Sequence, residues 1–339
     1  MSNANQQTIR SMLRRSQLKE SDKLNILTFC THERYEQNLC RTGHNFYSIN
    51  QGKTWNTDYG NIPENYNEID ILPWHITFDL ILCHTSCDRL ATAHKIKSMY
   101  NIPIIRHTHV LPDIRYDVQQ QKVSFNRSVP DHDSFISNYN KEAWGATNPR
   151  AGFIEHGIDF DFWSQDIGQV PRRNVCLSVV NEWPSRDWCC GWELWKETVG
   201  FGQENGLPVN VLGNSPGLSE AAPSLESLRK SYREASIFLN TSLHSPVPTV
   251  LMEAMASGCA IVSTNNCMIP EIIQHGENGL LANTADELRD HCLFLLNNPD
   301  EAERLGRNAQ ATIREKYNLE RFTNNWNKLF FNVIKKYRS

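Results

Sequence analysis

The chain has 339 residues, of which 40% are hydrophobic and 21% are charged, so it is long enough for two domains that each bury a core. Its net charge of -4 provides no overall positive field to attract nucleic acid or an anionic membrane. No apolar run reaches the roughly 18 residues that a membrane span needs. The ten cysteines include no Cys-x2-Cys pair and no signal peptide is evident, which together indicate a reduced, cytoplasmic protein.

The first segment of the chain, residues 1–23, differs in pattern from the rest of the sequence. Its stretch QQTIRSMLRRSQLKESDK is compatible with a short basic amphipathic helix from Thr8 to Leu18. A solvated, partly ordered leader is the favoured alternative, because terminal segments are commonly ordered only where they dock on the rest of the protein.

Strands and helices alternate from Leu24 onward. Short apolar runs bounded by polar residues predict buried strands, and a helical pattern over residues 86–100 separates two of them. The predicted strands are residues 24–30, 78–86, 102–111, 133–138 and 151–159. This alternation predicts a parallel sheet that is covered by helices on both faces.

A second block of the same kind follows a linker. The periodicity lapses over residues 157–174, where Gly168, Pro171 and two arginines are typical of a connection. Strands are then predicted at 174–180, 208–214 and 236–242, and helices at 188–202, 224–235, 284–297, 299–317 and 319–337. We therefore expect an α/β protein in which two Rossmann-like, doubly wound domains face each other across a ligand cleft. The expected parts are a leader (1–23), a first domain (24–165), a second domain (166–320) and a final helix (321–339) that crosses back to the first domain.

The most informative segment is SPVPTVLMEAMASGCAIVSTNNCMIPEIIQHGENGLLA, residues 245–282. Two prolines bracket a turn, after which Thr249 begins a predicted helix that ends before Gly258. The unpaired N–H groups of the first helical turn, together with the positive end of the helix dipole, favour a phosphate or diphosphate. Glu253 lies one turn into this helix, and its carboxylate can accept hydrogen bonds from the two hydroxyls of a ribose.

Residues 236–282 resemble the donor-binding segment of retaining glycosyltransferases that have the GT-B fold and are of the GT4 (glycosyl transferases group 1) type. That segment has two glutamates with seven residues between them, then Ala-Met-Ala, Gly, an apolar strand, Pro-Glu and Asn-Gly-Leu. The matching positions here are Glu253, Ala254–Ala256, Gly258, Pro270–Glu271 and Asn278–Leu280. The likeness extends loosely from Leu24 to Tyr337. It implies transfer of a sugar from a nucleotide-sugar donor with retention of anomeric configuration, the first domain binding the acceptor and the second the donor.

The resemblance implies roles for residues at both ends of the donor. Glu253 is predicted to be a catalytic residue that binds the ribose, whereas Ser245 replaces the family's first glutamate, which contacts the sugar ring. The family's Arg-x4-Lys pair, which neutralises the donor phosphates, falls on Asn181 and Arg186, so one of the two cations remains. The further residues of the predicted donor site are Gly213, Asn214, Pro248, Thr249 and Val250.

In the first domain, the resemblance places His109 near the reacting sugar, as a catalytic residue. His107 lies two positions earlier on the same predicted strand, so both side chains can face one side. A structural role is an equal alternative for His109. His32 and Glu33, in the segment THERY, occupy the place of the family's Gly-rich first loop and are predicted to bind substrate.

Metal ligation is the less favoured chemistry. The pairs Asp131/Asp133 and Asp159/Asp161 resemble the Asp-x-Asp metal pair of the other glycosyltransferase fold, but such short acidic pairs are common. The histidines at 32, 75, 84, 107 and 109 lack the spacing of a zinc site. We therefore expect no metal and no cofactor, with a UDP- or GDP-linked sugar as substrate.

The predicted function is thus metal-independent, retaining sugar transfer to an acceptor hydroxyl. The favoured acceptor is a surface polysaccharide or a lipid-linked glycan, which implies peripheral contact of a cytoplasmic enzyme with the inner face of the membrane. Alternatives are transfer to hydroxymethylated bases in DNA, as phage enzymes of similar architecture perform, a nucleotide-sugar epimerase, and a non-catalytic nucleotide-sugar binder. The acidic net charge disfavours the DNA acceptor.

Overall fold

The computed structural model describes residues 3–50, 53–57, 60–84, 87–165 and 171–338. The chain divides into two compact units: unit 1 comprises Met1–Gly157 and Leu319–Ser339, and unit 2 comprises Ile158–Asn318. Each unit is built on a sheet whose strands all pair in parallel. Within the part of the chain that is described, no helix has the length and apolar character needed to cross a membrane.

The sheet of unit 1 has seven strands in the order β3-β2-β1-β4-β5-β6-β7. Their bounds are β1 Asn25–Thr28, β2 Asn45–Ile49, β3 Tyr66–Ile69, β4 Leu80–His84, β5 Ile104–Thr108, β6 His132–Phe135 and β7 Ala151–Phe153. The register aligns His84 of β4 with His107 of β5, and His107 with Ser134 of β6. Three polar residues thus lie side by side near the carboxyl edge of this sheet.

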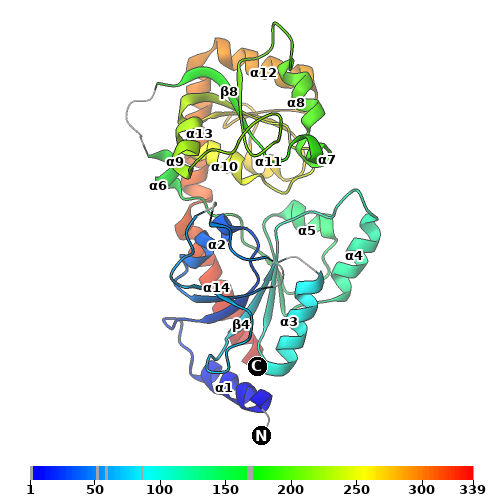
Figure 1. Cartoon of the computed structure of the whole chain (residues 1–339), viewed down its shortest axis with the longest axis vertical. Helices are drawn as coiled ribbons and strands as arrows, with labels where there is room; N and C mark the ends of the chain where they lie inside the picture. Colours follow the sequence, from blue (N-terminus) through cyan, green and yellow to red (C-terminus); the bar gives the residue numbers. More distant parts are fainter. Residues whose placement is uncertain (1–2, 51–52, 58–59, 85–86, 166–170, 339) are drawn as a thin grey trace. The chain divides into compact units, whose positions relative to one another are not determined.

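Helices cover both faces of the unit 1 sheet. They are α1 Asn3–Gln17, α2 Glu33–Cys40, α3 Cys87–Tyr100, α4 Val118–Arg127, α5 Asn138–Trp144 and α14 Leu319–Arg338. Neighbouring strand residues belong to different cores: Ile26 packs in a cluster with Trp326 of α14, whereas Leu27 packs in a cluster with Leu90 of α3. This alternation explains why the central strand β1 has apolar residues on both of its faces. Figure 1 shows α14, coloured red, among the blue and cyan elements of unit 1.

The sheet of unit 2 has five strands in the order β12-β11-β10-β8-β9. Its strands are β8 Arg173–Val179, β9 Val209–Leu212, β10 Ala235–Asn240, β11 Ala260–Thr264 and β12 Leu280–Ala282. Its helices are α6 Phe160–Ser164, η2 Pro184–Arg186, α7 Asp187–Cys190, α8 Trp192–Val199, α9 Leu225–Glu234, α10 Thr249–Ala256, α11 Ile269–Ile272, α12 Ala285–Asn297 and α13 Pro299–Lys316. The predicted class, two parallel-sheet α/β domains, is confirmed.

The N-terminal segment contains a docked helix, α1, that begins before the expected Thr8. Arg14 donates a hydrogen bond of 2.8 Å to Asp79, and Ser11 and Arg15 are buried. These contacts hold most of the segment against unit 1, rather than leaving it solvated as the sequence favoured.

Two strands lie in a region where the sequence predicts none. The burial of β2 alternates between buried and half-buried residues, and β3 has two exposed residues at its centre. Both strands therefore lack the continuous apolar run that marks β4. Strand β3 lies within residues 51–70, a stretch that the sequence indicates only as an aromatic and polar loop; of that stretch, 51–52 and 58–59 lie outside the described residues.

The single helix predicted over residues 188–202 is interrupted at Gly191. This residue has φ of +65° and separates α7 from α8. A Cβ atom built at this position would lie 2.0 Å from the carbonyl oxygen of Thr241. Glycine is therefore required here both by the left-handed backbone and by the close approach of the β10–α10 loop.

Candidate active site

The predicted donor residues of unit 2 follow the carboxyl ends of three strands that are neighbours in the sheet. Asn181 follows β8, Gly213 and Asn214 follow β9, and residues 241–248 follow β10. Because the strands are parallel and adjacent, these loops meet at one edge of the sheet, where ligands bind in such folds. The structure thus brings together residues that are up to 69 positions apart in the sequence, since Asn181 and Val250 lie at the two ends of the set.

The loops after β8 and β9 are bonded to each other. The backbone N–H of Asn214 donates to Oδ1 of Asn181 at 2.9 Å, and the N–H of Glu182 donates to the carbonyl of Asn214 at 2.8 Å. Gly213 has φ of +120°, and a Cβ atom there would lie 2.1 Å from the carbonyl oxygen of Val180. Asn181 therefore organises a loop through its side chain.

Arg186 supplies an exposed cation at this edge. It ends the short helix η2, and its side chain is exposed. Its Nη1 makes one long hydrogen bond, of 3.5 Å, to the carbonyl of Asn181. The backbone around it is held by Trp183, which is fully buried and whose N–H donates to Oγ of Ser215 at 3.0 Å. A guanidinium that is exposed on a well-anchored backbone is suited to bind an anionic group from solvent.

The β10–α10 loop packs on the segment that follows Arg186. The N–H groups of Leu243 and His244 donate to the carbonyl of Cys189 at 2.9 and 3.1 Å, and the hydroxyl of Thr241 donates to the carbonyl of Gly191 at 3.0 Å. These bonds place the loop that carries Ser245 beside α7. Ser245 is half-buried, which leaves part of its side chain accessible.

Helix α10 begins without a side-chain cap. Pro248 occupies the N-cap position and offers no side-chain hydrogen bond, while Thr249 and Val250 in the first turn are half-buried. The N–H of Leu251 donates to the carbonyl of Pro248 at 3.0 Å, so among the described residues the N–H groups of Thr249 and Val250 are the ones left to solvent or to a ligand.

Glu253 differs from the open carboxylate that the sequence suggested. Its exposed fraction is 3%, and the hydroxyl of Tyr232 donates to its Oε2 at 3.1 Å. One oxygen of the carboxylate is therefore already held by the protein. Tyr232 is not identifiable from the sequence, because it lies on α9 and carries no recognisable motif.

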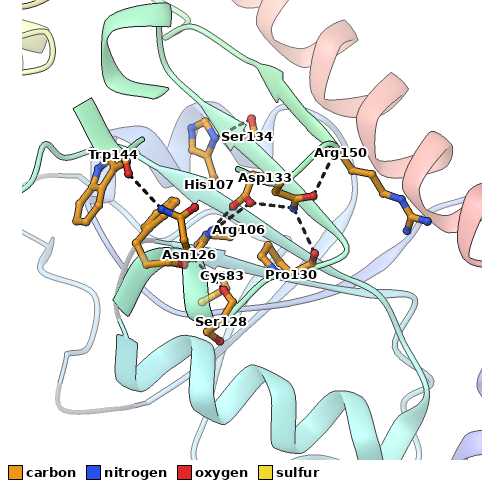
Figure 2. Close-up of polar contacts among 12 residues, drawn as sticks. Cys83, Arg106, His107, Asn126, Ser128, Pro130, Asp133, Ser134, Trp144 and Arg150 are labelled. Carbon is orange, nitrogen blue, oxygen red and sulfur yellow. Dashed lines mark hydrogen bonds and ion pairs between the residues drawn. The ribbon is translucent and has the colours of Figure 1, made fainter. Parts of the chain in front are cut away.

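In unit 1, His107 and His109 have different surroundings. The indole N–H of Trp326 donates to the hydroxyl of Tyr35 at 3.2 Å, so that hydroxyl can donate its proton to Nε2 of His107, 2.9 Å away. Nδ1 of His107 then carries the proton and donates to Oγ of Ser134 at 3.0 Å (Figure 2). Both ring nitrogens of the buried His107 are occupied, so His107 is a structural histidine.

The strand beneath this histidine is anchored by a buried ion pair. Arg106 of β5 forms a two-pronged contact with Asp133 of β6, at 2.6 and 3.0 Å (Figure 2). Asn148 donates to the same carboxylate at 2.8 Å, and the guanidinium lies 3.5 Å from the ring centre of Phe125. This network fixes the register that carries His107 and, two residues on, His109.

His109 lies just beyond the end of β5 and is half-buried. Its Nε2 lies 2.7 Å from Nδ1 of the buried His84, at the end of β4. Its ring is edge-on to that of Tyr35, with 4.4 Å between the centroids. Its environment supports a ligand contact better than that of His107, because only Nε2 is engaged by a hydrogen bond among the described residues.

The predicted residues of the first loop divide in their exposure. His32 is exposed at the N-terminus of α2. Glu33 is buried, and its Oε1 accepts from the N–H of Asn56 at 3.2 Å and lies 3.4 Å from Nζ of Lys53. The carboxylate of Glu33 therefore organises the neighbouring loop. These contacts favour a structural role for Glu33 over direct binding of substrate.

Three of the four aspartates of the two acidic pairs make structural contacts. Asp131 is bonded by Lys97 at 2.6 Å and Asp133 by Arg106, while Asp159 caps α6 by accepting from the N–H of Phe162 at 3.1 Å. Among the described residues, no group of three or more His, Cys, Asp or Glu side chains is arranged to hold a metal ion.

Comparison with solved structures defines the class of fold. The structure of HepE from Anabaena in complex with UDP superposes with a TM-score of 0.72 at 14% identity, covering 92% of this chain and 100% of that one. This is the GT-B fold of glycosyltransferases.

Sequence comparison narrows the assignment for part of unit 2. Residues 222–312 match the model of the family "Glycosyl transferases group 1". N-acetyl-alpha-D-glucosaminyl L-malate synthase of Bacillus anthracis is 30% identical over 88 residues, which are 25% of this chain and 23% of that protein. A probable sucrose-phosphate synthase of Thermosipho melanesiensis is 32% identical over 117 residues, 33% of this chain and 26% of that protein. The chain thus aligns with about a quarter of the length of these curated relatives.

Proposed function

We propose that the chain is a glycosyltransferase that moves a sugar from a nucleotide-sugar donor to an acceptor hydroxyl. The observation that carries this proposal is the family match over residues 222–312, which contains the uncapped start of α10 and Glu253. Arg186 lies at the same edge of the same sheet and supplies an exposed cation. The donor would therefore bind unit 2, with its diphosphate at α10 and Arg186 and its ribose toward Glu253.

The chemistry of sugar transfer explains why these groups suffice. As the bond between the anomeric carbon and the diphosphate breaks, negative charge grows on the leaving phosphate. Fixed N–H groups and a guanidinium aimed at that phosphate stabilise the transition state more than the ground state. The acceptor hydroxyl attacks from the side that the diphosphate leaves and gives its proton to the departing phosphate oxygen, which retains the configuration. His109 is the unit 1 residue proposed to contact the sugar.

Metal independence is part of the proposal. Arg186 and the helix N–H groups would take the place that a divalent cation has in other glycosyltransferases. Turnover is expected to continue in EDTA. An absolute requirement for Mn²⁺ or Mg²⁺ would contradict this part of the proposal.

The sugar and the acceptor define the two remaining choices. Ser245 stands where the family has a glutamate that contacts the sugar ring, so Ser245→Ala is expected to change the preference among sugars on one nucleotide. For the acceptor we propose a surface polysaccharide or lipid-linked glycan at the inner face of the membrane. The names of the relatives also include L-malate as a component of a product, so small hydroxy acids belong in the acceptor panel.

The experiment is a panel of UDP-, GDP- and ADP-sugars, with each acceptor class, in which released nucleotide and glycosylated product are detected by mass spectrometry. UDP-sugars come first because HepE was solved with UDP. Conversion of a donor without any acceptor would indicate an epimerase instead. Binding of a donor without turnover would indicate a nucleotide-sugar binder, and product on hydroxymethylated DNA would indicate the phage-type activity.

A further inference from the structure

A chain of three polar side chains leads from helix α2 to the end of β5 in unit 1. Oε1 of Glu36 lies 3.4 Å from Nε2 of His84, and Nδ1 of His84 lies 2.7 Å from Nε2 of His109. Glu36 is 0% exposed and His84 is 1% exposed. Within the described residues, neither Nε2 of His84 nor Oε2 of Glu36 has a hydrogen-bond partner of its own. The carboxyl group of Glu36 is therefore the group with which this nitrogen of His84 can bond.

In such a chain, the choice of donor or acceptor at one end determines the choice at the other end. A neutral imidazole has one N–H donor and one acceptor nitrogen, so bonding at one nitrogen dictates the character of the other. Burial lowers the pKa of His84 to about 3, and burial together with the neighbouring histidines lowers the pKa of His109 well below its usual range. Both rings are therefore neutral near pH 7. The donor or acceptor character of Glu36 is then repeated at Nδ1 of His109.

We propose that Glu36, acting through His84, is a positioning residue that sets whether His109 presents an N–H donor or a lone pair at Nδ1. When Glu36 is protonated, its O–H donates to His84, His84 donates from Nδ1 to His109, and His109 carries its proton at Nδ1. When Glu36 is ionised, every bond in the chain reverses and His109 carries its proton at Nε2. The relevance to sugar transfer rests on the proposed function, because it requires His109 to contact the sugar.

The proton balance of this reversal is simple. Glu36 gives its proton to Nε2 of His84, His84 gives its Nδ1 proton to Nε2 of His109, and His109 releases its Nδ1 proton. One proton is lost overall, and it leaves the chain at Nδ1 of His109. Ionisation of a fully buried acid is thus expressed as a change at the half-buried His109.

The surroundings of Glu36 determine its pKa and therefore the pH at which His109 changes tautomer. Burial is the main cause that raises the pKa of Glu36 from 4.5 to about 8, and the charge of Glu33 adds to it. The N–H of Thr31 and the charges of Lys53 and Arg89 act in the opposite direction. The other titratable groups near the chain are Cys30, Cys40 and Tyr66 beside Glu36, and His32, Tyr35, His107 and His156 beside His109. The donor form of His109 is expected below about pH 8 and the acceptor form above it.

The direct test is nitrogen NMR of the full-length protein labelled with ¹⁵N in histidine rings, recorded on both sides of pH 8. The spectrum of His109→Asn identifies the His109 signals by their loss. In the wild type, His109 should be protonated at Nδ1 at the lower pH and at Nε2 at the higher pH. In Glu36→Gln, which cannot ionise, His109 should keep one tautomer throughout. If the reaction uses this nitrogen, kcat/KM should show an inflection near pH 8 that Glu36→Gln lacks.

Glu33→Gln is the matched control, because it removes a buried acid from the same helix without touching His84. Its His109 should still change tautomer, at a somewhat lower pH, since a charge that raises the pKa of Glu36 is gone. A single tautomer of His109 across the range in wild type, or the same change in Glu36→Gln, would overturn the proposal. The NMR measurement uses no nucleotide sugar, so these outcomes leave the proposed function standing. Absence of sugar transfer with an intact tautomer change would overturn only the catalytic use of the relay.

Discussion

Glu253 lies one turn into α10, and its buried carboxylate accepts a hydrogen bond from the hydroxyl of Tyr232 at Oε2. If Glu253 binds the ribose, Glu253→Gln should keep the fold but weaken nucleotide-sugar binding by about 1–3 kcal/mol, the scale of a hydrogen bond to a charged group. Isothermal titration calorimetry with the best donor measures this loss. Tyr232→Phe keeps the charge and should cost less. Unchanged donor affinity in Glu253→Gln would refute the ribose role.

Arg186 should affect the rate more than the binding of donor. Its exposed guanidinium is proposed to meet the diphosphate where charge grows during the reaction. Arg186→Ala is therefore expected to lower kcat/KM by roughly 10²–10³, the loss typical of one preorganised donor, and Arg186→Lys should recover part of it. Steady-state kinetics with one donor measures kcat/KM for both Arg186 variants. The control is Arg307→Ala, which removes an exposed arginine of α13. Equal rates for Arg186→Ala and Arg307→Ala would mean that Arg186 does not bind the diphosphate.

For single residues, the sequence predicts those features that depend on residues close together in the chain. The start of α10 and the position of Glu253 depend on residues within one turn of each other, and both are evident from the pattern. The partner of Glu253 is not, because Tyr232 lies 21 positions earlier and reaches it only through the fold. The same holds for Glu36, His84 and His109, which come from three elements and meet only because β1, β4 and β5 are adjacent in the sheet. In the sequence, His84 stands out only as one of several histidines that could bind a metal but lack the spacing of a zinc site.

In unit 2, the loop after β9 depends on one glycine. Gly213 has φ of +120°, and a Cβ atom there would lie 2.1 Å from the carbonyl oxygen of Val180. Gly213→Ala should lower the free energy of unfolding by about 2–4 kcal/mol, since it combines backbone strain with a clash against the main chain. Gly217 is the matched control: it also has positive φ, +81°, but a Cβ atom there would meet no other atom within 4 Å.

Denaturant unfolding of both variants makes this comparison. Gly217→Ala should show only the smaller cost of the left-handed backbone, roughly 1 kcal/mol. Equal losses for the two variants would show that the close approach of Val180 contributes nothing. Donor affinity of Gly213→Ala reports in addition whether the joined loops of Asn181 and Asn214 are needed for binding.

Element prediction succeeds where a strand is buried on both faces and fails where it is not. Strands β4 and β5 are buried along their whole length and are evident as apolar runs. Strand β3 is the edge strand, with the polar residues Asn67 and Glu68, and β2 lies next to it. Both strands are stabilised by pairing with a neighbouring strand, which their composition does not reveal. The break at Gly191 depends on Thr241, 50 positions later, which no local pattern reports.

The stability of the whole protein should depend on pH in two opposite ways. Burial lowers the pKa of His84 to about 3 and that of His156 to about 4, from 6.5, so the unfolded chain binds protons that the folded chain excludes. Stability should therefore fall as the pH drops below about 6.5. Glu36 acts in the opposite sense: its pKa is raised from 4.5 to about 8, so the unfolded chain loses its proton first and stability falls as the pH rises between these values.

Denaturant unfolding at a series of pH values separates the two contributions. Glu36→Gln should remove the loss of stability between about pH 4.5 and 8 while leaving the loss on the acid side. An identical pH dependence in wild type and Glu36→Gln would show that Glu36 is not a neutral buried acid in the folded protein.

The central claim, that this two-unit protein transfers sugar from a nucleotide-sugar donor, is tested most directly by mass spectrometry of the donor panel after incubation with acceptors. We expect one donor to yield both its free nucleoside diphosphate and an acceptor enlarged by one sugar, and Arg186→Ala to suppress both products. The claim would be contradicted if every UDP-, GDP- and ADP-sugar remained intact with all acceptors, or if a donor were consumed at the same rate by the wild type and Arg186→Ala.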